Sequence, residues 1–311
     1  MNNIICIAGP TASGKTALAV ELAKELHGEV VSCDSMQIYR RMNIGTAKPT
    51  MEEMQGIPHH MIDVAEPDED FSVSRYCEMA SGIVDDMIAR GKTAIIAGGT
   101  GLYMDSLIKG NAFAPFPSTG MREKLEQQAD REGLEAMHAL LASIDPESAA
   151  RLPVADRKRV IRALEVYYET GETITQHNLK TQAIPPKYTP LWLGLDFEDR
   201  ADLYRRIDLR VELMLQSGLV EEIQSLLSEG IPAHCTAMQA IGYKEFVDAL
   251  EGRATIAEAA AQVQQSSRRY AKRQLTWFRR NRQMHWLIRR PKDGFEEILA
   301  KARQVLHEND N

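Results

Sequence analysis

The clearest chemical signal in the sequence is a glycine-rich segment near its start. It fits the phosphate-binding pattern G-x-x-x-x-G-K-[ST], and its residues are Gly9, Pro10, Thr11, Ala12, Ser13, Gly14, Lys15 and Thr16. Glycines let the backbone curl until successive N–H groups point inward, and a following helix adds its positive N-terminal end. Lys15 supplies a cation for the outer phosphate oxygens, and Thr16 offers a hydroxyl to Mg²⁺. The segment, called the P-loop below, therefore predicts a site for a diphosphate or triphosphate group.

The elements around the P-loop predict an α/β fold. Apolar runs indicate buried strands, and the candidates are Ile4–Ala8, Glu29–Cys33, Thr93–Ala97 and Leu191–Leu195, with a short one at Met61–Val64. Helical periodicity indicates helices between them, for example over Gly14–His27 and Ser72–Arg90. Apolar strands separated by helices are typical of a parallel sheet that is covered by helices on both faces.

The sequence pattern of the middle of the chain predicts helices only. From Ser118 to about Lys180 no segment has the pattern of a strand, and long helices follow the last predicted strand to about Arg282. We therefore expect two domains. Residues 1–113 and 190–311 would form a P-loop core with C-terminal basic helices, and residues 114–189 would form an all-helical insertion domain.

Polar groups follow three of the predicted strands, where ligands of open parallel sheets bind. These groups are the P-loop, Asp34 and, after two glycines, Thr100. The Asp34 carboxylate could accept a proton, organise Mg²⁺ or cap its own turn. The Thr100 hydroxyl could reach the same cleft or cap the helix that follows it. A phosphate site with a carboxylate and a hydroxyl beside it is therefore expected at this edge of the sheet.

Composition excludes several classes of protein. The 311 residues are 44% hydrophobic and 26% charged, with a net charge of -7, so the chain is neither disordered nor basic throughout. No stretch approaches the roughly 20 apolar residues that a membrane-spanning helix needs. The four cysteines are scattered, which predicts reduced thiols and a cytoplasmic protein rather than a zinc site. Adjacent histidines cannot face one metal from a regular element, so His59 and His60 are expected to be structural.

A basic segment near the C-terminus stands out in this acidic chain. Residues 268–290 contain nine lysines and arginines and no acid. On a helix, Arg268, Lys272 and Arg279 fall within roughly 40° of one another, and Trp277 faces the other side. Cations without compensating acids repel each other unless a polyanion screens them. The row therefore favours contact with nucleic acid over a merely solvated face, and Arg157–Arg162 forms a weaker basic cluster.

These residues resemble one family, the tRNA dimethylallyltransferases, also called tRNA isopentenyltransferases. The motifs that carry the resemblance follow the family's order over nearly the whole chain. They are GPTASGKT at 9–16, DSMQIY at 34–39, IGTAKP at 44–49, PHHMIDV at 58–64, GGTGLY at 98–103, RALEVY at 162–167, QAIGYKE at 239–245 and YAKRQLTWFR at 270–279. The P-loop is shared with many ATP-binding proteins, whereas DSMQIY with IGTAKP and GGTGLY is specific to this family.

The resemblance implies a reaction and its partners. A dimethylallyl group would pass from dimethylallyl diphosphate to N6 of the adenosine that lies 3′ of the tRNA anticodon. The P-loop would hold the diphosphate leaving group instead of a nucleotide, with Mg²⁺ as cofactor. The partner would be the anticodon stem-loop of tRNA, and the protein is expected to be a monomer. A nucleotide or small-molecule kinase, and an RNA-binding NTPase switch without transferase activity, are the alternatives.

The resemblance also implies roles for individual residues. The expected catalytic residues are Asp34 as general base, Thr100, Arg210 and Lys15, although Arg210 could also be an ordinary surface arginine of its helix. The residues expected to contact tRNA are Asp34, Ser35, Met36, Gln37, Thr100, Arg122, Lys158, Arg159, Val160, Ile161, Arg162, Gly242, Tyr243, Lys244, Arg268, Lys272 and Arg279.

Overall fold

The structure is a computed structural model that describes residues 3–110 and 119–310. The chain divides into two compact units, unit 1 (Met1–Gly110 with Lys187–Asn311) and unit 2 (Asn111–Pro186). The expected boundary between residues 113 and 114 lies outside the described residues. The second boundary follows residue 186, whereas the sequence predicted it after residue 189.

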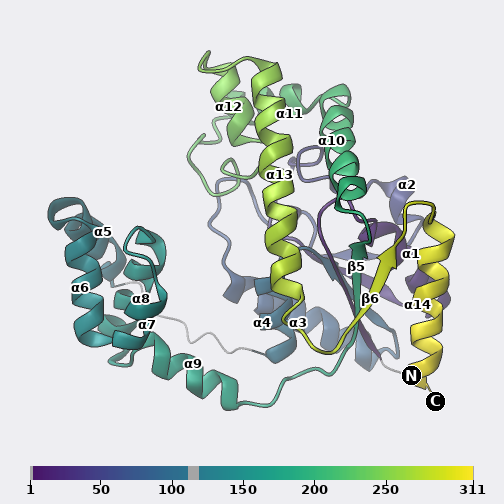
Figure 1. Cartoon of the computed structure of the whole chain (residues 1–311), viewed down its shortest axis with the longest axis horizontal. Coiled ribbons are helices and arrows are strands. Elements are labelled where there is room, and N and C mark those ends of the chain that lie inside the picture. Colours follow the sequence, from purple (N-terminus) through teal and green to yellow (C-terminus); the bar gives the residue numbers. More distant parts are fainter. Residues whose placement is uncertain (1–2, 111–118, 311) are drawn as a thin grey trace. The chain divides into compact units, whose positions relative to one another are not determined.

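Unit 1 is built on a six-stranded sheet (Figure 1). Its strands are β1 (Ile4–Ala8), β2 (Glu29–Cys33), β3 (His59–His60), β4 (Ala94–Gly98), β5 (Leu191–Phe197) and β6 (Met284–Arg289). Their order is β3-β2-β4-β1-β5-β6, and every neighbouring pair is parallel. The α/β class is therefore confirmed. Because β2, β4 and β1 are neighbours, the segments that follow them meet at one edge of the sheet.

Two strands differ from the sequence prediction. The third strand is His59–His60 instead of Met61–Val64, since the pairing with Val30 and Val31 falls on the histidines. Strand β6 was not predicted, because it lies in the basic segment and its buried residues, Met284 and Leu287, are three positions apart instead of alternating. It pairs with β5 over its full length. The two histidines are structural in this arrangement: Nδ1 of His59 lies 2.8 Å from the Ile57 carbonyl, and Nε2 of His60 lies 2.8 Å from Glu29.

Helices cover both faces of this sheet. Helices α1 (Lys15–Glu25) and α14 (Phe295–Asp310) share one apolar core with strand residues such as Ile5, Ile7 and Val30. The strand residue Cys33 points to the opposite face, where Tyr76 of α3 (Val73–Ala89) donates a 3.0 Å hydrogen bond to the Ser32 carbonyl. The remaining helices of unit 1 are α2 (Met51–Met54), α4 (Gly101–Lys109), α10 (Arg200–Gln216), α11 (Leu219–Ser228), α12 (Lys244–Leu250) and α13 (Ile256–Phe278).

The described residues of unit 2 form helices joined by turns and no strand, as the sequence predicted. Its helices are α5 (Met121–Glu132), α6 (Leu134–Ile144), α7 (Pro146–Arg151), α8 (Arg157–Thr170) and α9 (Ile174–Ala183). They enclose a separate core in which Leu125, Met137, Leu141 and Leu164 are buried. Asp145 ties α7 to α9, because its carboxylate accepts hydrogen bonds from the backbone N–H groups of Ser148 and Thr175.

Across the described parts of both units, no helix combines the length and the apolarity needed to cross a bilayer. The four cysteines are free thiols. Burial raises the pKa of Cys77 to about 12, and it is also the main cause of the raised pKa values of Cys6 and Cys33. Cys6 and Cys33 are thus small buried groups of the sheet core.

Candidate active site

The P-loop connects β1 to α1, which is the context that its pattern requires. Its backbone is left-handed at Ala12 (φ 62°) and at Gly14 (φ 94°), conformations that curl the chain. Gly9 has a φ of 152°, and a Cβ there would lie 2.9 Å from the carbonyl oxygen of Leu195 on β5. Only glycine therefore lets the loop pass this close to the neighbouring strand. The buried hydroxyl of Ser13 has no hydrogen-bond partner among the described residues.

Lys15 lies inside this curled loop. Its Nζ donates a 2.7 Å hydrogen bond to the carbonyl of Pro10. Burial lowers the pKa of the Lys15 ammonium to about 7, and the charge of Arg210 lowers it as well, whereas the charge of Asp34 raises it. An anion placed here would offset both unfavourable effects, so the loop is electrostatically suited to a phosphate group.

Helix α10 brings two arginines to the P-loop. Nη1 of Arg210 donates to Oγ1 of Thr11 across 3.2 Å, and Nε of Arg206 donates to the carbonyl of Ala12 across 2.9 Å. Burial lowers the pKa of Arg210, opposed by the charges of Asp34 and Glu53. Arg210 is therefore held against the phosphate loop and is not an ordinary surface arginine. The structure brings together Lys15 and Arg210 as the sequence predicted.

Asp34 follows β2 beside the P-loop. Its Oδ1 accepts hydrogen bonds from the backbone N–H groups of Met36 (2.9 Å) and Gln37 (3.4 Å), so one oxygen does cap the local turn. Oδ2 accepts none from the residues that the structure describes. The charge of Asp34 acts on both Lys15 and Arg210. One oxygen thus fixes the carboxylate, and the other is left for a proton or a metal-bound water.

Thr100 follows β4 and contacts the Asp34 turn. Its Oγ1 accepts a 3.1 Å hydrogen bond from the N–H of Ser35, and its own N–H donates to the Cys33 carbonyl across 3.2 Å. Thr100 occupies the N-cap position of α4, but its hydroxyl makes no capping hydrogen bond. The helix-cap explanation for this hydroxyl is therefore wrong. Burial raises the pKa of the nearby Tyr270 to about 12, and the charge of Asp34 raises it too.

Gln37 is already engaged within the protein. Its Nε2 donates to the carbonyl of Ala47 across 3.1 Å, and its Oε1 accepts from the Ser32 hydroxyl across 2.9 Å. The amide therefore fastens the IGTAKP loop to β2. The expected contact of Gln37 with tRNA stays a prediction, and both ends of its amide are occupied within the protein. Ser35 and Met36, from the same motif, are half-buried and lie between Asp34 and Gln37.

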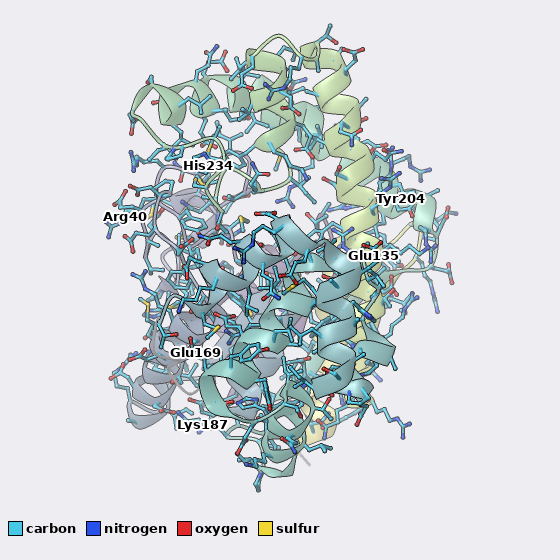
Figure 2. All side chains as sticks on the ribbon, turned by 90° about the vertical axis from the view of Figure 1, so that its left-hand side faces the viewer. Arg40, Glu135, Glu169, Lys187, Tyr204 and His234 are labelled. Carbon is cyan, nitrogen blue, oxygen red and sulfur yellow. The ribbon has the colours of Figure 1, made fainter. Side chains whose placement is uncertain are left out.

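The IGTAKP loop is also fastened from the C-terminal half of unit 1. Two carboxylate oxygens of Glu222 accept hydrogen bonds from the N–H groups of Asn43 and Ile44, each 2.8 Å, and from the Tyr243 hydroxyl at 2.6 Å. Figure 2 labels Arg40, which precedes this loop in the sequence, and His234, which lies between Glu222 and Tyr243 in the sequence. The side chain of Tyr243 is fully buried. Its expected contact with tRNA stays a prediction, and its hydroxyl is engaged with Glu222 in the core.

The two sequence neighbours of Tyr243, Gly242 and Lys244, differ from each other in exposure. Gly242 is buried and its N–H donates to Glu245 across 2.9 Å, within the turn that starts α12. Gly242 has a left-handed φ of 97°, which explains a glycine at this position. Lys244 is exposed. Of the three residues predicted to contact tRNA here, Lys244 offers a side chain at the surface.

The basic row on α13 is partly neutralised by acids from other elements. Arg268 pairs with Asp208 of α10 at 2.5 Å, and Arg279 pairs with Asp196 of β5 at 2.7 Å. The premise that the row lacks compensating acids is therefore wrong for these two arginines. Lys272 is exposed and is not among the ion pairs of the described residues. Helix α13 ends at Phe278, so Arg279 lies at its C-cap.

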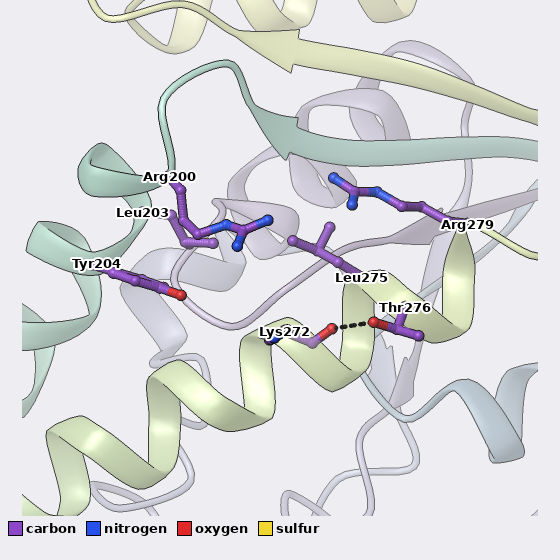
Figure 3. Close-up of a pocket in the computed structure, with 7 residues that line it drawn as sticks. All are labelled: Arg200, Leu203, Tyr204, Lys272, Leu275, Thr276 and Arg279. Carbon is purple, nitrogen blue, oxygen red and sulfur yellow. Dashed lines mark hydrogen bonds between the residues drawn. The ribbon is translucent and has the colours of Figure 1, made fainter.

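A small cavity of about 60 Å³ opens between α10 and α13 (Figure 3). It is lined by Arg200, Leu203, Tyr204, Lys272, Leu275, Thr276 and Arg279. The guanidinium groups of Arg200 and Arg279 both extend toward the space above Leu275, and the Thr276 hydroxyl donates to the Lys272 carbonyl across 2.9 Å. The cavity is cationic, and none of its lining residues belongs to the P-loop or to the turns after β2 and β4.

The basic residues of unit 2 that were predicted to contact tRNA fall into two groups. Arg162 and Arg122 both contact Glu165, at 2.9 and 3.6 Å. Lys158 and Arg159 are exposed, with Arg159 3.3 Å from Asp156. Between them and Arg162 on α8 lie two apolar residues, Val160 and Ile161, which are fully buried in the core of unit 2. Their expected contact with tRNA stays a prediction, and their side chains belong to the core of unit 2.

Sequence reasoning missed the contacts of Gln274. Its Oε1 accepts a 2.9 Å hydrogen bond from the N–H of Thr11 in the P-loop, and its Nε2 donates to the Gly99 carbonyl across 3.0 Å. The YAKRQLTWFR motif contains Gln274, but a glutamine in a basic amphipathic helix carries no sign of partners 263 and 175 positions away.

The donors for Mg²⁺ are few. No group of three or more histidines, cysteines or acids among the described residues could hold a metal ion by itself. Mg²⁺ bound to phosphates needs only one or two protein ligands, because it keeps several waters. Thr16 at the start of α1 and the free oxygen of Asp34 suit that kind of site. The Ser13 hydroxyl has no hydrogen-bond partner among the described residues, so it could bind a further polar group.

Comparison with known proteins identifies the family. Residues 37–281 match the family model described as IPP transferase. A tRNA dimethylallyltransferase of a Thermoanaerobacter species is 46% identical over 297 residues, which cover 95% of this chain and 94% of that protein. The crystal structure of the full-length tRNA isopentenylpyrophosphate transferase from Bacillus halodurans is 39% identical, covers 99% of each chain and has a TM-score of 0.71.

A structure from a study of a eukaryotic dimethylallyltransferase acting on tRNA is also similar. It is 28% identical, with a TM-score of 0.86, and the match covers 100% of this chain and 79% of that one. The motifs found in the sequence, the strand edge that gathers them and the matches over most of the chain agree. This chain belongs to the tRNA dimethylallyltransferase family.

Proposed function

We propose that this protein transfers a dimethylallyl group from dimethylallyl diphosphate to N6 of the adenosine 3′ of the tRNA anticodon, releasing diphosphate. Family membership makes the chain a transferase that modifies tRNA. Our proposal goes beyond family membership in naming the donor, the acceptor atom and the role of each residue. One observation supports these assignments. At the common edge of β1, β2 and β4, the P-loop with Lys15 lies beside the carboxylate of Asp34.

The leaving group is the first requirement of the reaction. When the allylic carbon–oxygen bond breaks, its electron pair goes to the diphosphate, so negative charge grows there. Lys15, Arg210 and the inward N–H groups of the P-loop would stabilise that charge. Because the pKa of Lys15 is lowered to about 7 without an anion, a bound diphosphate would restore its proton.

The nucleophile is the second requirement. The exocyclic N6 of adenosine is nearly non-basic, and it must lose a proton as its bond to carbon forms. The free oxygen of Asp34 would accept that proton, which is the work of a general base. The Thr100 hydroxyl, held by the N–H of Ser35, would position the amine. In total, a nitrogen–carbon bond forms and the carbon–oxygen bond breaks. The proton moves from N6 to Asp34, and the diphosphate leaves with the electron pair.

Mg²⁺ would neutralise part of the diphosphate charge, with Thr16 as its protein ligand. The adenosine must leave its stack to reach a site at the end of a sheet, so we expect base flipping. Exposed cations such as Lys272, Lys244 and Lys158 would hold the phosphates of the anticodon stem-loop. Because its substrate is tRNA, we expect the enzyme to work in the cytoplasm. A monomer remains our expectation for its oligomeric state.

A nucleotide or small-molecule kinase is not favoured, since the relatives that match the whole chain are transferases acting on tRNA. The direct experiment incubates the protein with bulk tRNA, Mg²⁺ and radiolabelled dimethylallyl diphosphate, with γ-labelled ATP as the control donor. Label should enter tRNA from dimethylallyl diphosphate only. Label transferred from ATP, with none from dimethylallyl diphosphate, would contradict the proposal.

A further inference from the structure

Gln274 connects the P-loop to the turn after β4, and the proposed reaction requires a fixed distance between these two loops. It lies on α13 and is 5% exposed. One end of its amide accepts from Thr11 in the P-loop, and the other donates to Gly99, the residue before Thr100. These two loops leave neighbouring parallel strands, β1 and β4, which pair from Ile4 to Ala8. Beyond the strand ends the sheet no longer sets their separation.

The fit around this amide is tight. A Cβ added at Gly99 would lie 2.1 Å from Nε2 of Gln274, so the loop backbone rests directly on the amide. The two bonds also have fixed directions, because Oε1 can only accept and Nε2 can only donate. A residue with one function, such as glutamate or methionine, cannot replace both bonds. The amide thus defines the distance between the two loops.

We propose that Gln274 is a positioning residue that fixes the spacing between the leaving-group side and the nucleophile side of the active site. This inference rests on the proposed function. The P-loop holds the leaving group, and Thr100, bonded to the Asp34 turn through Ser35, lies on the nucleophile side. In a displacement reaction, a misplacement of about 1 Å between these sides costs about 10²-fold in rate.

The same contact changes the expected role of Thr11. Its N–H is already bound by Gln274, and its hydroxyl accepts from Arg210. Thr11 therefore serves as the anchor of two side chains, and the remaining N–H groups of the P-loop are left for the diphosphate. Removal of Gln274 would free the Thr11 N–H, which is a change that can be observed without any substrate.

The test compares Gln274→Met and Gln274→Glu with the control Gln265→Met, an exposed glutamine on the same helix. Glutamate keeps the acceptor for Thr11 but faces the Gly99 carbonyl with a second acceptor. Single-turnover rates at saturating substrates should fall about 10²-fold in both Gln274 variants. Affinities for dimethylallyl diphosphate and tRNA should stay close to wild type, and the control should match wild type in all three. A wild-type single-turnover rate in Gln274→Met would overturn the proposal.

Hydrogen exchange at the Thr11 amide supplies a readout that is independent of activity. Exchange should be faster in Gln274→Met than in the unsubstituted protein and unchanged in Gln265→Met. Unchanged exchange in Gln274→Met would overturn the positioning role, even if the rate fell. Faster exchange in a protein that transfers no dimethylallyl group would support the contact and contradict the proposed function. Failure of the positioning role and failure of the proposed function can therefore be told apart.

Discussion

The backbone N–H of Ser35 donates a 3.1 Å hydrogen bond to Oγ1 of Thr100. This bond connects the turn after β2 with the turn after β4, and Asp34 is the residue immediately before Ser35. Since Asp34 is itself held by the N–H of Met36, the carboxylate and the hydroxyl are fixed as one unit. A pair that is positioned in advance loses little entropy when substrate binds, which is an advantage for proton transfer.

The first prediction concerns the charge inside the P-loop. Lys15→Ala should abolish turnover, because the diphosphate loses the cation that stabilises its growing charge. Binding of tRNA should remain nearly intact, since in our proposal exposed cations elsewhere hold its phosphates. Single-turnover assays and filter binding measure the two effects separately. Near-wild-type turnover would remove the P-loop from the mechanism.

The second prediction concerns the proton on that lysine. At pH 8 the Lys15 amine, with its pKa lowered to about 7, is mostly neutral in the free protein. A bound diphosphate raises this pKa, so dimethylallyl diphosphate should bind with uptake of nearly one proton. Calorimetry in buffers of different ionisation enthalpy measures the uptake, and Lys15→Met should lack it. Equal heats in all buffers for the unsubstituted protein would refute the assignment.

The third prediction separates paired from unpaired cations on α13. Lys272→Ala should reduce the slope of log affinity for tRNA against log salt by about 0.7–0.9, the value for one phosphate contact. Arg268→Ala should act mainly on stability, because it leaves Asp208 without its partner. Lys24→Ala, at the far end of α1, is the control and should leave the slope unchanged. An unchanged slope in Lys272→Ala would mean that this face is only solvated.

The fourth prediction concerns stability in acid. Two hydrogen bonds from Arg90, at 2.6 and 3.0 Å, lower the pKa of Glu29 to about 2, and His60 contributes a further bond. A carboxylate with a lowered pKa stabilises the fold above its ordinary pKa of 4.5, and this contribution is lost as pH falls towards 2. Glu29→Gln should therefore lower the free energy of unfolding at pH 7 by on the order of 2 kcal/mol.

Urea unfolding across pH 2 to 7 tests this prediction. The difference between Glu29→Gln and the unsubstituted protein should shrink between pH 4.5 and 2. Glu78→Gln, at an exposed position of α3, serves as the control and should follow the unsubstituted protein. A difference that stays constant over this range would show that Glu29 stabilises the fold by packing and not by its charge.

Local patterns predicted much of the catalytic unit. The P-loop, Asp34 and Thr100 each follow an apolar strand, and the parallel sheet then places them at one edge without further information. Strand β6 escaped prediction because it is an edge strand without a two-residue alternation of buried positions, and it closely follows the basic helix in the sequence. Local sequence therefore indicated the site better than it indicated the border of the sheet.

Contacts between distant segments were the part that sequence could not supply. The acids that neutralise Arg268 and Arg279 come from α10 and β5, so a basic row on α13 appeared unpaired. The buried state of Tyr243 depends on Glu222, 21 positions away in the sequence. Gln274 shows the same limit, since nothing in its own helix distinguishes it from Gln265. Such roles follow from packing, which a single sequence does not encode in a local pattern.

The central claim is that Asp34 accepts the proton of the attacking amine beside the diphosphate loop, and one measurement tests it most directly. Asp34→Asn preserves the shape of the side chain and an oxygen for the Met36 N–H, but it removes the basic carboxylate. Single-turnover transfer at saturating substrates should fall about 10²–10⁴-fold and stay low across a Mg²⁺ titration. Recovery towards the wild-type rate at high Mg²⁺ would contradict the claim and make Asp34 a metal organiser.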